Sequence, residues 1–363
     1  MAPSVSLSSV TSVDLLILGL GWTGTFLAPH LKSSHPSLSY AATTRDGRDG
    51  TLAWTWDPEQ EGAAQYETLP RAKTVVVVFP IKGEGGSRRL VEGYEEAVGG
   101  RVRWIQLGST GIFDGGPTLA ATRAAVAKAS SSSEKPPAPA EPLEWTTRHS
   151  LYDRTNARAI AEDELLSMHE ETFVLNLSGL WVRRSLLSRF FLYSASGKKE
   201  ELTESPGEQG GTRDPANWIP RIATSKAALE AKGSLHLIHG LDVSRAIIAV
   251  HLSPPSPSFS SQQQQQDKKE QTQPLLGRRY ILTDLRVLDW FDLVSRYAPG
   301  PPSSSSHEET PPAALWVQQL MDEHNIRSLP RTPQELGRAL DSREFWREFG
   351  LMPVRGGYER GRL

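Results

Sequence analysis

The chain has 363 residues and a formal net charge of −2. This length accommodates one large domain, or a large domain with a smaller appendage. The near-neutral charge gives no indication of a nucleic-acid or membrane-surface partner. The absence of cysteine excludes disulfide bonds, thiolate metal sites and a cysteine nucleophile.

The start of the chain and its hydropathy favour a soluble, cytoplasmic protein. Residues 1–14 lack the basic region and long apolar run of a secretory signal, and they contain no arginine, which a mitochondrial presequence would carry. No segment approaches the ~20 apolar residues of a membrane span. We therefore expect a small-molecule substrate, no membrane or nucleic-acid partner, and a disordered N-terminus over residues 1–12.

Short apolar strands alternate with helical segments along the first half of the chain. The predicted strands cover residues 13–18, 39–44, 74–79, 103–107 and 173–177. The predicted helices cover residues 23–31, 88–98 and 156–168, and Pro29 should kink or shorten the first of them. A further short strand is expected around residues 54–56. This alternation predicts an α/β fold, a Rossmann-type doubly wound parallel sheet covered by helices on both faces.

The second half of the chain contains fewer such segments. Residues 235–238 and 280–283 are predicted strands, and residues 242–251 and 287–297 are predicted helices. Three Ser-, Pro- or Gln-rich stretches are read as disordered insertions in surface loops, at residues 127–142, 253–274 and 299–312. We expect a nucleotide-binding domain over 13–180. Residues 181–363 should form a small C-terminal substrate-binding region, interleaved with the last strands and helices of the Rossmann core.

Residues 19–24 read G-x-G-x-x-G, directly between a predicted strand and a predicted helix. In that context Gly19 permits a tight turn, Gly21 lets a pyrophosphate approach the backbone, and Gly24 lets the helix pack close to the strand. The helix N-terminus offers N–H groups and partial positive charge to phosphates. We therefore predict dinucleotide binding, with Trp22 and Thr23 as further candidate contacts. The alternative is a structural turn that binds nothing.

The end of the second strand indicates which dinucleotide is bound. NAD sites usually have Asp or Glu there, whereas this strand ends in Thr44 and Arg45, whose guanidinium suits the 2′-phosphate of NADP. Asp46 can compete, so NAD stays open, and Arg45 can also be read as a solvated loop residue. Phe79 and Pro80, at the end of the valine-rich strand, are further candidate cofactor contacts.

In their order along the chain, these motifs resemble the short-chain dehydrogenase/reductase superfamily. The resemblance is to an atypical member of its extended branch, the NAD-dependent epimerase/dehydratase group. It is carried by the glycine turn, QLGSTGIFD (106–114), NLSGLW (176–181), HGLDVSRAI (239–247) and the segment 340–363. The resemblance implies a Rossmann-type domain, a nicotinamide cofactor and a C-terminal substrate region, but it does not specify a substrate.

The resemblance also implies a mechanism with three parts. A Ser or Thr hydroxyl holds the substrate oxygen, a Tyr transfers the proton, and a Lys four residues later lowers the pKa of that Tyr from about 10. Ser109 and Thr110 match the first part. Their alternative role is to satisfy backbone groups at a strand end.

The second and third parts are incomplete. Tyr152 is the candidate proton donor, but Asn156 stands four residues later and carries no charge. A second register places Arg158, four residues before Glu162, in the lysine position, where it offers a permanent cation to the cofactor. Alternatively, Arg154, Arg158 and Glu162 form a surface ladder of ion pairs.

Two functions follow. The first is an NADP- or NAD-dependent oxidoreductase or epimerase acting on a small carbonyl- or hydroxyl-bearing metabolite. The second is a dinucleotide-binding sensor or regulator without turnover. No His, Asp or Glu cluster has metal-ligand spacing, so no metal is expected. His239 and Asp242 are expected to fix a strand–helix junction, with Asp242 as the helix N-cap.

Overall fold

The computed structural model describes residues 12–116, 144–181, 219, 222–255, 276–297 and 312–356. The expected insertion at 127–142 lies outside the described residues. So do residues 1–11 of the expected N-terminal tail, residues 256–274 of the second insertion and residues 299–311 of the third.

A seven-stranded, all-parallel sheet forms the centre of the molecule. Its strands, in spatial order, are β10 (Arg278–Leu282), β6 (Thr172–Leu177), β5 (Arg103–Ser109), β4 (Ala72–Val77), β1 (Val13–Leu18), β2 (Tyr40–Thr44) and β3 (Leu52–Ala53). The chain order reverses between β1 and β4, and in open α/β sheets ligands bind outside the carboxyl ends of the strands at such a point. The predicted Rossmann-type sheet is confirmed.

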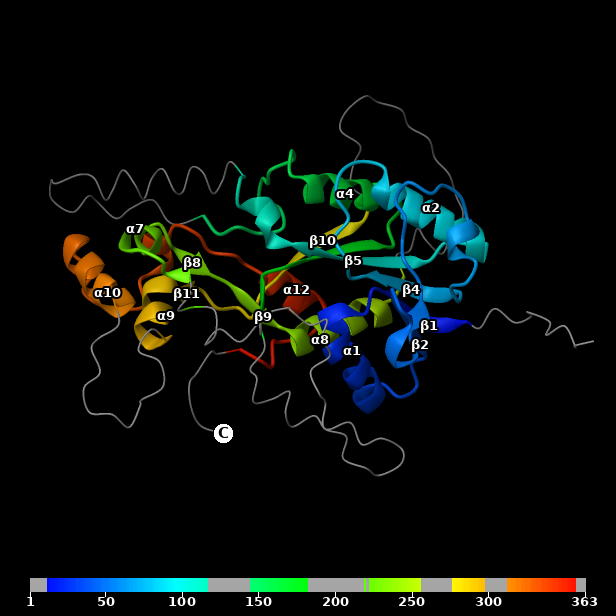
Figure 1. Ribbon diagram of the computed structural model, residues 1–363, viewed down its shortest axis with the longest axis horizontal. Coiled ribbons are helices and arrows are strands. Elements are labelled where there is room, and N and C mark those ends of the chain that lie inside the picture. Colours follow the sequence, from blue (N-terminus) through cyan, green and yellow to red (C-terminus); the bar gives the residue numbers. More distant parts are fainter. Residues whose placement is uncertain are drawn as a thin grey trace, which may run out of the picture.

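Helices cover both faces of the sheet (Figure 1). On one face lie α2 (Gly86–Val98) and α4 (Ala157–Leu166), and on the other lie α1 (Gly21–Ser34) and α8 (Gly240–Leu252). Because side chains alternate along a strand, Leu15 and Ile17 of β1 join the core cluster with α1 and α8. Leu16 and Leu18 join the cluster with α2 and α4. Burial on both faces explains the continuous apolar runs that predicted these strands.

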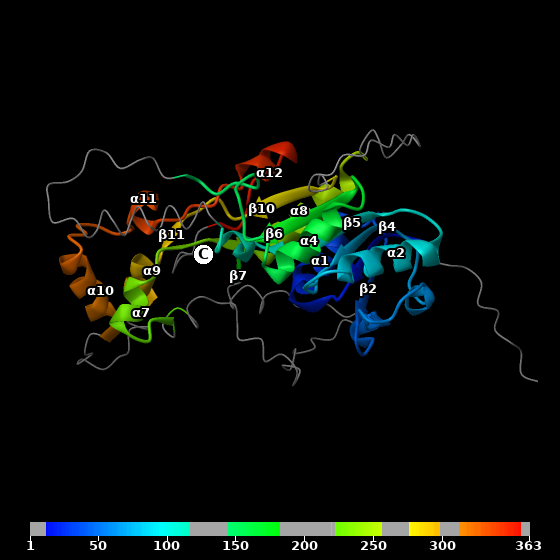
Figure 2. The same ribbon diagram turned by 90° about the horizontal axis from the view of Figure 1, so that it is seen from above.

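The later part of the chain forms a smaller group of elements to one side of the sheet (Figures 1 and 2). Its helices are α7 (Lys226–Glu230), α9 (Trp290–Tyr297), α10 (Pro312–Glu323) and α11 (Pro333–Leu336). Its short strands are β8 (Ser234–Leu235), paired with β11 (Leu288–Asp289), and β7 (Gly179–Trp181), paired with β9 (Leu237–His239). The last helix, α12 (Arg343–Glu348), returns to pack on β10.

Several predicted elements differ from the structure. The predicted strand at residues 54–56 is wrong, because the strand is Leu52–Ala53 and Trp54 follows it as a buried residue whose Nε1 donates to the Gln65 carbonyl at 2.8 Å. The predicted helix over 287–297 begins only at Trp290. Asp289 belongs to a strand, and its carboxylate accepts a hydrogen bond from the Phe291 N–H at 2.9 Å.

Helix α1 continues past Pro29 to Ser34, so the proline does not shorten it. The predicted strand over 235–238 is divided between β8 and β9, with His236 between them. None of the helices in the described ranges combines the length and the apolar character needed to cross a membrane.

Candidate functional site

The glycine turn is held by the end of β2. The N–H of Gly19 donates to Thr43 Oγ1 at 2.9 Å, and the N–H of Leu20 donates to the Thr43 carbonyl at 2.9 Å. Gly19 has a φ of 79°, and a Cβ there would lie 3.2 Å from Cδ1 of Phe79. Gly19 therefore serves the tight turn, as predicted, and brings the ends of β1, β2 and β4 together.

The backbone at Gly21 is open to approach. Gly21 is exposed, and a Cβ built on it would meet only Val78 Cγ1, at 4.0 Å. In the first turn of α1, the N–H groups of Gly21 and Thr23 have no acceptor among the described residues. Unpaired N–H groups at a helix N-terminus form an anion site, so this turn fits a pyrophosphate.

The role predicted for Gly24 needs a correction. A Cβ on Gly24 would lie 2.2 Å from Cγ of Leu20, so the close neighbour is the side chain of the turn itself and not a strand residue. Thr23 is buried beside it, whereas Trp22 is partly exposed, with its ring 4.8 Å from that of Phe26. The third glycine therefore lets Leu20 fold back over the start of the helix.

The residues after β2 are exposed around Arg45. Thr44 Oγ1 lies 2.6 Å from Thr51 Oγ1, and Arg45 makes no hydrogen bond or ion pair with another described residue. A hydrogen bond from Thr44 is the main cause that lowers the pKa of Asp46, whose carboxylate is therefore ionised at neutral pH. Arg48, which the sequence reading did not single out, is a second exposed cation in this loop.

The end of β4 contributes an aromatic wall. The rings of Phe79 and Trp56 are stacked, with centroids 5.5 Å apart and an interplanar angle of 25°. The Phe79 carbonyl accepts a hydrogen bond from Nε2 of Gln106 at 3.1 Å, which joins this loop to β5. Trp56 and Gln106 were missed from the sequence, because no local pattern places either of them beside Phe79.

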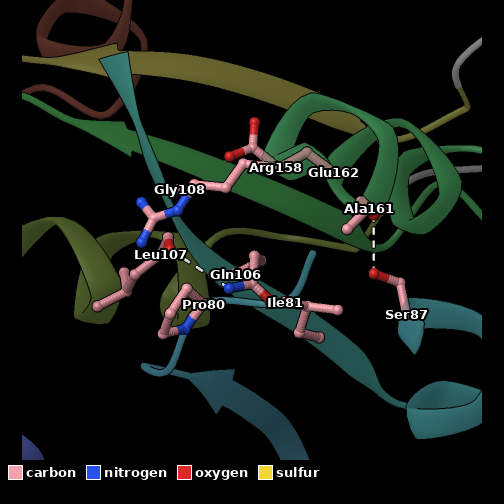
Figure 3. Close-up of a pocket in the computed structure, with 9 residues that line it drawn as sticks. All are labelled: Pro80, Ile81, Ser87, Gln106, Leu107, Gly108, Arg158, Ala161 and Glu162. Atoms are coloured by element: carbon pink, nitrogen blue, oxygen red, sulfur yellow. Dashed lines mark hydrogen bonds between the residues drawn. The ribbon is translucent and has the colours of Figure 1, made fainter. Parts of the chain in front are cut away.

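A small pocket lies between α4 and the ends of β4 and β5 (Figure 3). It is lined by Pro80, Ile81, Ser87, Gln106, Leu107, Gly108, Arg158, Ala161 and Glu162. Figure 3 shows Arg158 reaching from α4 across β5, with its guanidinium on the side of Leu107 and Pro80. The guanidinium forms no hydrogen bond or ion pair with the rest of the described chain, so it can bind a ligand.

Asn156 does not reach this pocket. It is the N-cap of α4, and its Oδ1 accepts a hydrogen bond from the Arg158 N–H at 2.9 Å. Of the two registers left open by the sequence, the structure therefore brings Arg158 to the end of β5. The alternative surface ladder is wrong, because Glu162 is buried and pairs with Arg279.

Ser109 and Thr110 lie where β5 ends. Ser109 Oγ accepts a hydrogen bond from the Gly111 N–H at 3.1 Å and caps the short 3₁₀ turn that follows. Its hydroxyl therefore serves the backbone, but the hydroxyl hydrogen can still be donated to a ligand. Thr110 is buried, with 6% of its surface exposed.

Tyr152 is held by an acidic partner. Its Oη donates to Asp163 Oδ1 at 2.7 Å, and the guanidinium of Arg279 lies 4.5 Å from the centre of its ring. Burial is the largest cause that raises the pKa of Tyr152, and the Asp163 bond adds to it, whereas Arg279 opposes both. A phenol with a raised pKa is a poor base at neutral pH.

Behind Ser109 lies a buried polar network. Asn176 Nδ2 donates to Glu162 Oε2 at 2.8 Å and to the Ser109 carbonyl at 3.2 Å. Arg279 NH2 lies 3.3 Å from Glu162 Oε2 and 2.9 Å from Asp163 Oδ1. Burial raises the pKa of Glu162, against the opposing charge of Arg279. The sequence reading used Glu162 as a register mark and as a member of the surface ladder, and it missed Asn176 and Arg279.

The predicted N-cap at Asp242 is wrong. His239 is the N-cap of α8, and its Nδ1 accepts the Leu241 N–H at 3.1 Å. Asp242 lies in the first helical turn, where its two carboxylate oxygens accept the N–H groups of Val354 and Arg355, each at 2.9 Å. His239 thus fixes the strand–helix junction as expected, while Asp242 fixes the C-terminal segment. Within the described ranges, no three His, Asp or Glu side chains are grouped so as to hold a metal ion.

The seven-stranded parallel sheet, with helices on both faces, defines a Rossmann-type α/β fold. L-threonine dehydrogenase from Phytophthora infestans superposes with a TM-score of 0.50 at 13% identity, covering 94% of each chain. UDP-glucose 4-epimerase from Thermus thermophilus, solved in complex with NAD, gives a TM-score of 0.49 at 12% identity, covering 95% of this chain and 96% of that chain. No family model and no curated protein sequence matches the chain. At 13% identity, the likeness to the L-threonine dehydrogenase structure establishes the fold alone.

Proposed function

We propose that this protein binds a nicotinamide dinucleotide, NADP in preference to NAD. We further propose that it acts as an oxidoreductase or epimerase on a small metabolite with a carbonyl or hydroxyl group. The observation that carries the proposal is the glycine turn. Its backbone is open at Gly21, and the N–H groups of Gly21 and Thr23 have no acceptor among the described residues, at the carboxyl end of the sheet.

The preference for NADP rests on the end of β2. Arg45 is exposed and unpaired among the described residues, and Thr44 supplies a hydroxyl beside it. A guanidinium recognises a phosphate by charge-assisted hydrogen bonds. Asp46 is ionised and exposed at the next position, so it is the residue that would favour the ribose hydroxyls of NAD instead.

The residues at the end of β5 would carry the chemistry. When bound, the nicotinamide supplies hydride transfer. Ser109 and Thr110 would hold the substrate oxygen, and Arg158 would hold the cofactor as a permanent cation. Tyr152 is the candidate proton donor in this scheme, and it would have to exchange its Asp163 partner for the substrate oxygen.

A second function is favoured by that Asp163 bond. Tyr152 has a raised pKa and no lysine partner, so the protein can bind a dinucleotide without efficient proton transfer. On this alternative the chain is an NADP-binding sensor or regulatory protein.

Binding and turnover separate the two functions. A cofactor present at 100 times its Kd should add about 2.7 kcal/mol of stability, which thermal unfolding with NADPH and NADH would detect. Net oxidation of NADPH in the presence of a panel of aldehydes and ketones would support a reductase, and inversion of a hydroxyl-bearing substrate without net oxidation would support an epimerase. Binding with neither reaction would support the sensor. If neither cofactor raises the melting temperature at high excess, both functions are wrong.

A pair of glycine variants controls this experiment. Gly21→Asp places a carboxylate where the pyrophosphate would approach and should abolish binding of both cofactors. Gly99→Asp is the matched control. Gly99 also has a positive φ and open surroundings, but it caps the far end of α2. Equal loss of binding in the two variants would show that backbone strain, and not the glycine turn, is responsible.

A further inference from the structure

The backbone at the end of β5 lies directly against two buried polar side chains. A Cβ on Gly108 would lie 2.5 Å from Asn176 Nδ2 and 2.5 Å from Glu162 Oε1, so only glycine fits there without moving them. Glu162 has 3% of its surface exposed and Asn176 has none. Glu162 also lines the pocket that Arg158 enters.

These two side chains hold the Ser109 main chain. Asn176 Nδ2 donates to the Ser109 carbonyl at 3.2 Å, and the Glu162 carboxylate lies beside the backbone at Gly108. Asn176 also donates to Glu162 Oε2 at 2.8 Å, which fixes the two side chains relative to each other. The position of Ser109 is therefore set by α4 and β6 as well as by its own strand.

Packing alone does not account for a carboxylate at this place. Burying a charge costs free energy, and apolar side chains of similar size often serve a core equally well or better. The cost is offset by Arg279, which pairs with Glu162 and with Asp163. What the carboxylate adds over an apolar side chain is an acceptor that orients Asn176 toward the Ser109 carbonyl.

We infer that Glu162 and Asn176 form a clamp on the Ser109 main chain, so that the Ser109 and Thr110 hydroxyls are presented to the substrate in one fixed geometry. Glu162 is then a positioning residue, acting through Ser109. The inference rests on the proposed function for what the hydroxyls bind. The clamp itself can be tested without a substrate.

The test is amide hydrogen exchange of the peptide covering residues 105–111, compared between the wild-type protein and Glu162→Gln. The variant preserves side-chain size, and Arg279 keeps Asp163 as a partner, so the fold should persist. We expect exchange of this peptide to rise about tenfold, because the charge-assisted bond that orients Asn176 becomes a neutral one.

Two further variants make the result specific. Asn176→Leu removes the donor to Ser109 without adding charge and should give the same local rise. Glu164→Gln is the matched control on α4, since its carboxylate binds the N–H groups of Gly85 and Arg88 instead. It should raise exchange near residues 85–88 and leave residues 105–111 unchanged.

The outcomes are separable from those of the proposed function. Unchanged exchange of residues 105–111 in Glu162→Gln would overturn the clamp, whether or not NADPH binds. A uniform rise across β5 and β6 with a lower melting temperature would overturn it as well, because Glu162 would then only stabilise the core. Failure of the wild type to bind NADPH would count against the proposed function alone. Once a turnover assay exists, Glu162→Gln should lower kcat, whereas the matched Glu164→Gln should not.

Discussion

Tyr152 and Asp163 are joined by a hydrogen bond of 2.7 Å between the phenolic oxygen and the carboxylate. It ties the segment before α4 to the same charged network that supports Ser109, because Asp163 shares Arg279 with Glu162. Tyr152, the candidate proton donor, is therefore also part of this hydrogen-bonded network.

Replacing the phenol of Tyr152 tests whether this residue mainly transfers a proton or mainly stabilises the fold. Tyr152→Phe keeps the ring contact with Phe113 and loses the bond to Asp163, so stability should fall by about 1 kcal/mol in urea unfolding. The NADPH affinity should not change. A fall in turnover of more than about a hundredfold at this modest cost in stability would identify Tyr152 as the proton donor, and unaltered turnover would remove it from the mechanism.

Substitutions of Arg158 and Asn156 should have opposite effects on cofactor affinity and on stability. Arg158→Ala should weaken NADPH and NADH alike, by about tenfold, because the ribose it would contact is common to both. Asn156→Ala should leave both affinities unchanged and cost about 1 kcal/mol of stability, because it removes the N-cap of α4. Calorimetric titration and urea unfolding measure the two effects. A larger loss of affinity in Asn156→Ala would show that Asn156 is the cofactor contact.

The residues that follow β2 should determine the preference between NADPH and NADH. Arg45→Ala should weaken NADPH by about tenfold and leave NADH nearly unchanged, because only NADPH carries the 2′-phosphate. Arg48→Ala, in the same exposed loop, controls for a general loss of positive charge. Equal loss of NADPH and NADH affinity in Arg45→Ala would refute this interpretation of the second strand.

Asp284 should make stability depend on pH. Burial raises its pKa to about 6 from 3.8, and 3% of its side chain is exposed. Between these values the folded protein holds a proton that the unfolded chain has released, so stability falls as the pH rises, by about 3 kcal/mol in total. Asp284→Asn should equal the wild type near pH 4 and exceed it at pH 8.

The titration of His239 changes the stability in the opposite direction with pH. Burial lowers its pKa to about 4 from 6.5, so its contribution to stability is lost as the pH falls between those values. Because His239 is present in both proteins, its effect cancels in the difference between Asp284→Asn and the wild type. Urea unfolding at several pH values gives that difference, and a difference independent of pH would contradict the assignment to Asp284.

The sheet could be read from the sequence because its signals are local. Each central strand is buried on both faces, so it appears as a continuous apolar run such as the four valines of 75–78. The two-residue strands gave no such signal, since β3 and β11 exist only through their pairing partners. The N-cap of α8 was misplaced because His239 can cap as well as Asp242, and only the contacts of Asp242 with the C-terminal segment decide between them.

The candidate site could likewise be predicted only where its sequence signals are local. The glycine turn is contiguous, so its spacing and context sufficed. The polar network behind Ser109 could not be predicted, because Arg279 lies 117 residues after Glu162 and reaches it only when β10 pairs with β6. Asn156 and Arg158 both had suitable spacing, and the difference between a helix cap and a pocket residue is set by the direction of each side chain.

The late position of β10 and α12 has a consequence for biosynthesis. Leu15 of the first strand and Trp346 of the last helix belong to one core cluster, so this core cannot close until nearly the whole chain has left the ribosome. A nascent chain that ends after β6 would present an open strand edge and a Glu162 carboxylate without its arginine. During translation, the half of the chain that supplies β1 to β6 therefore depends on residues made last, and its intermediates are the species that chaperones would be expected to hold.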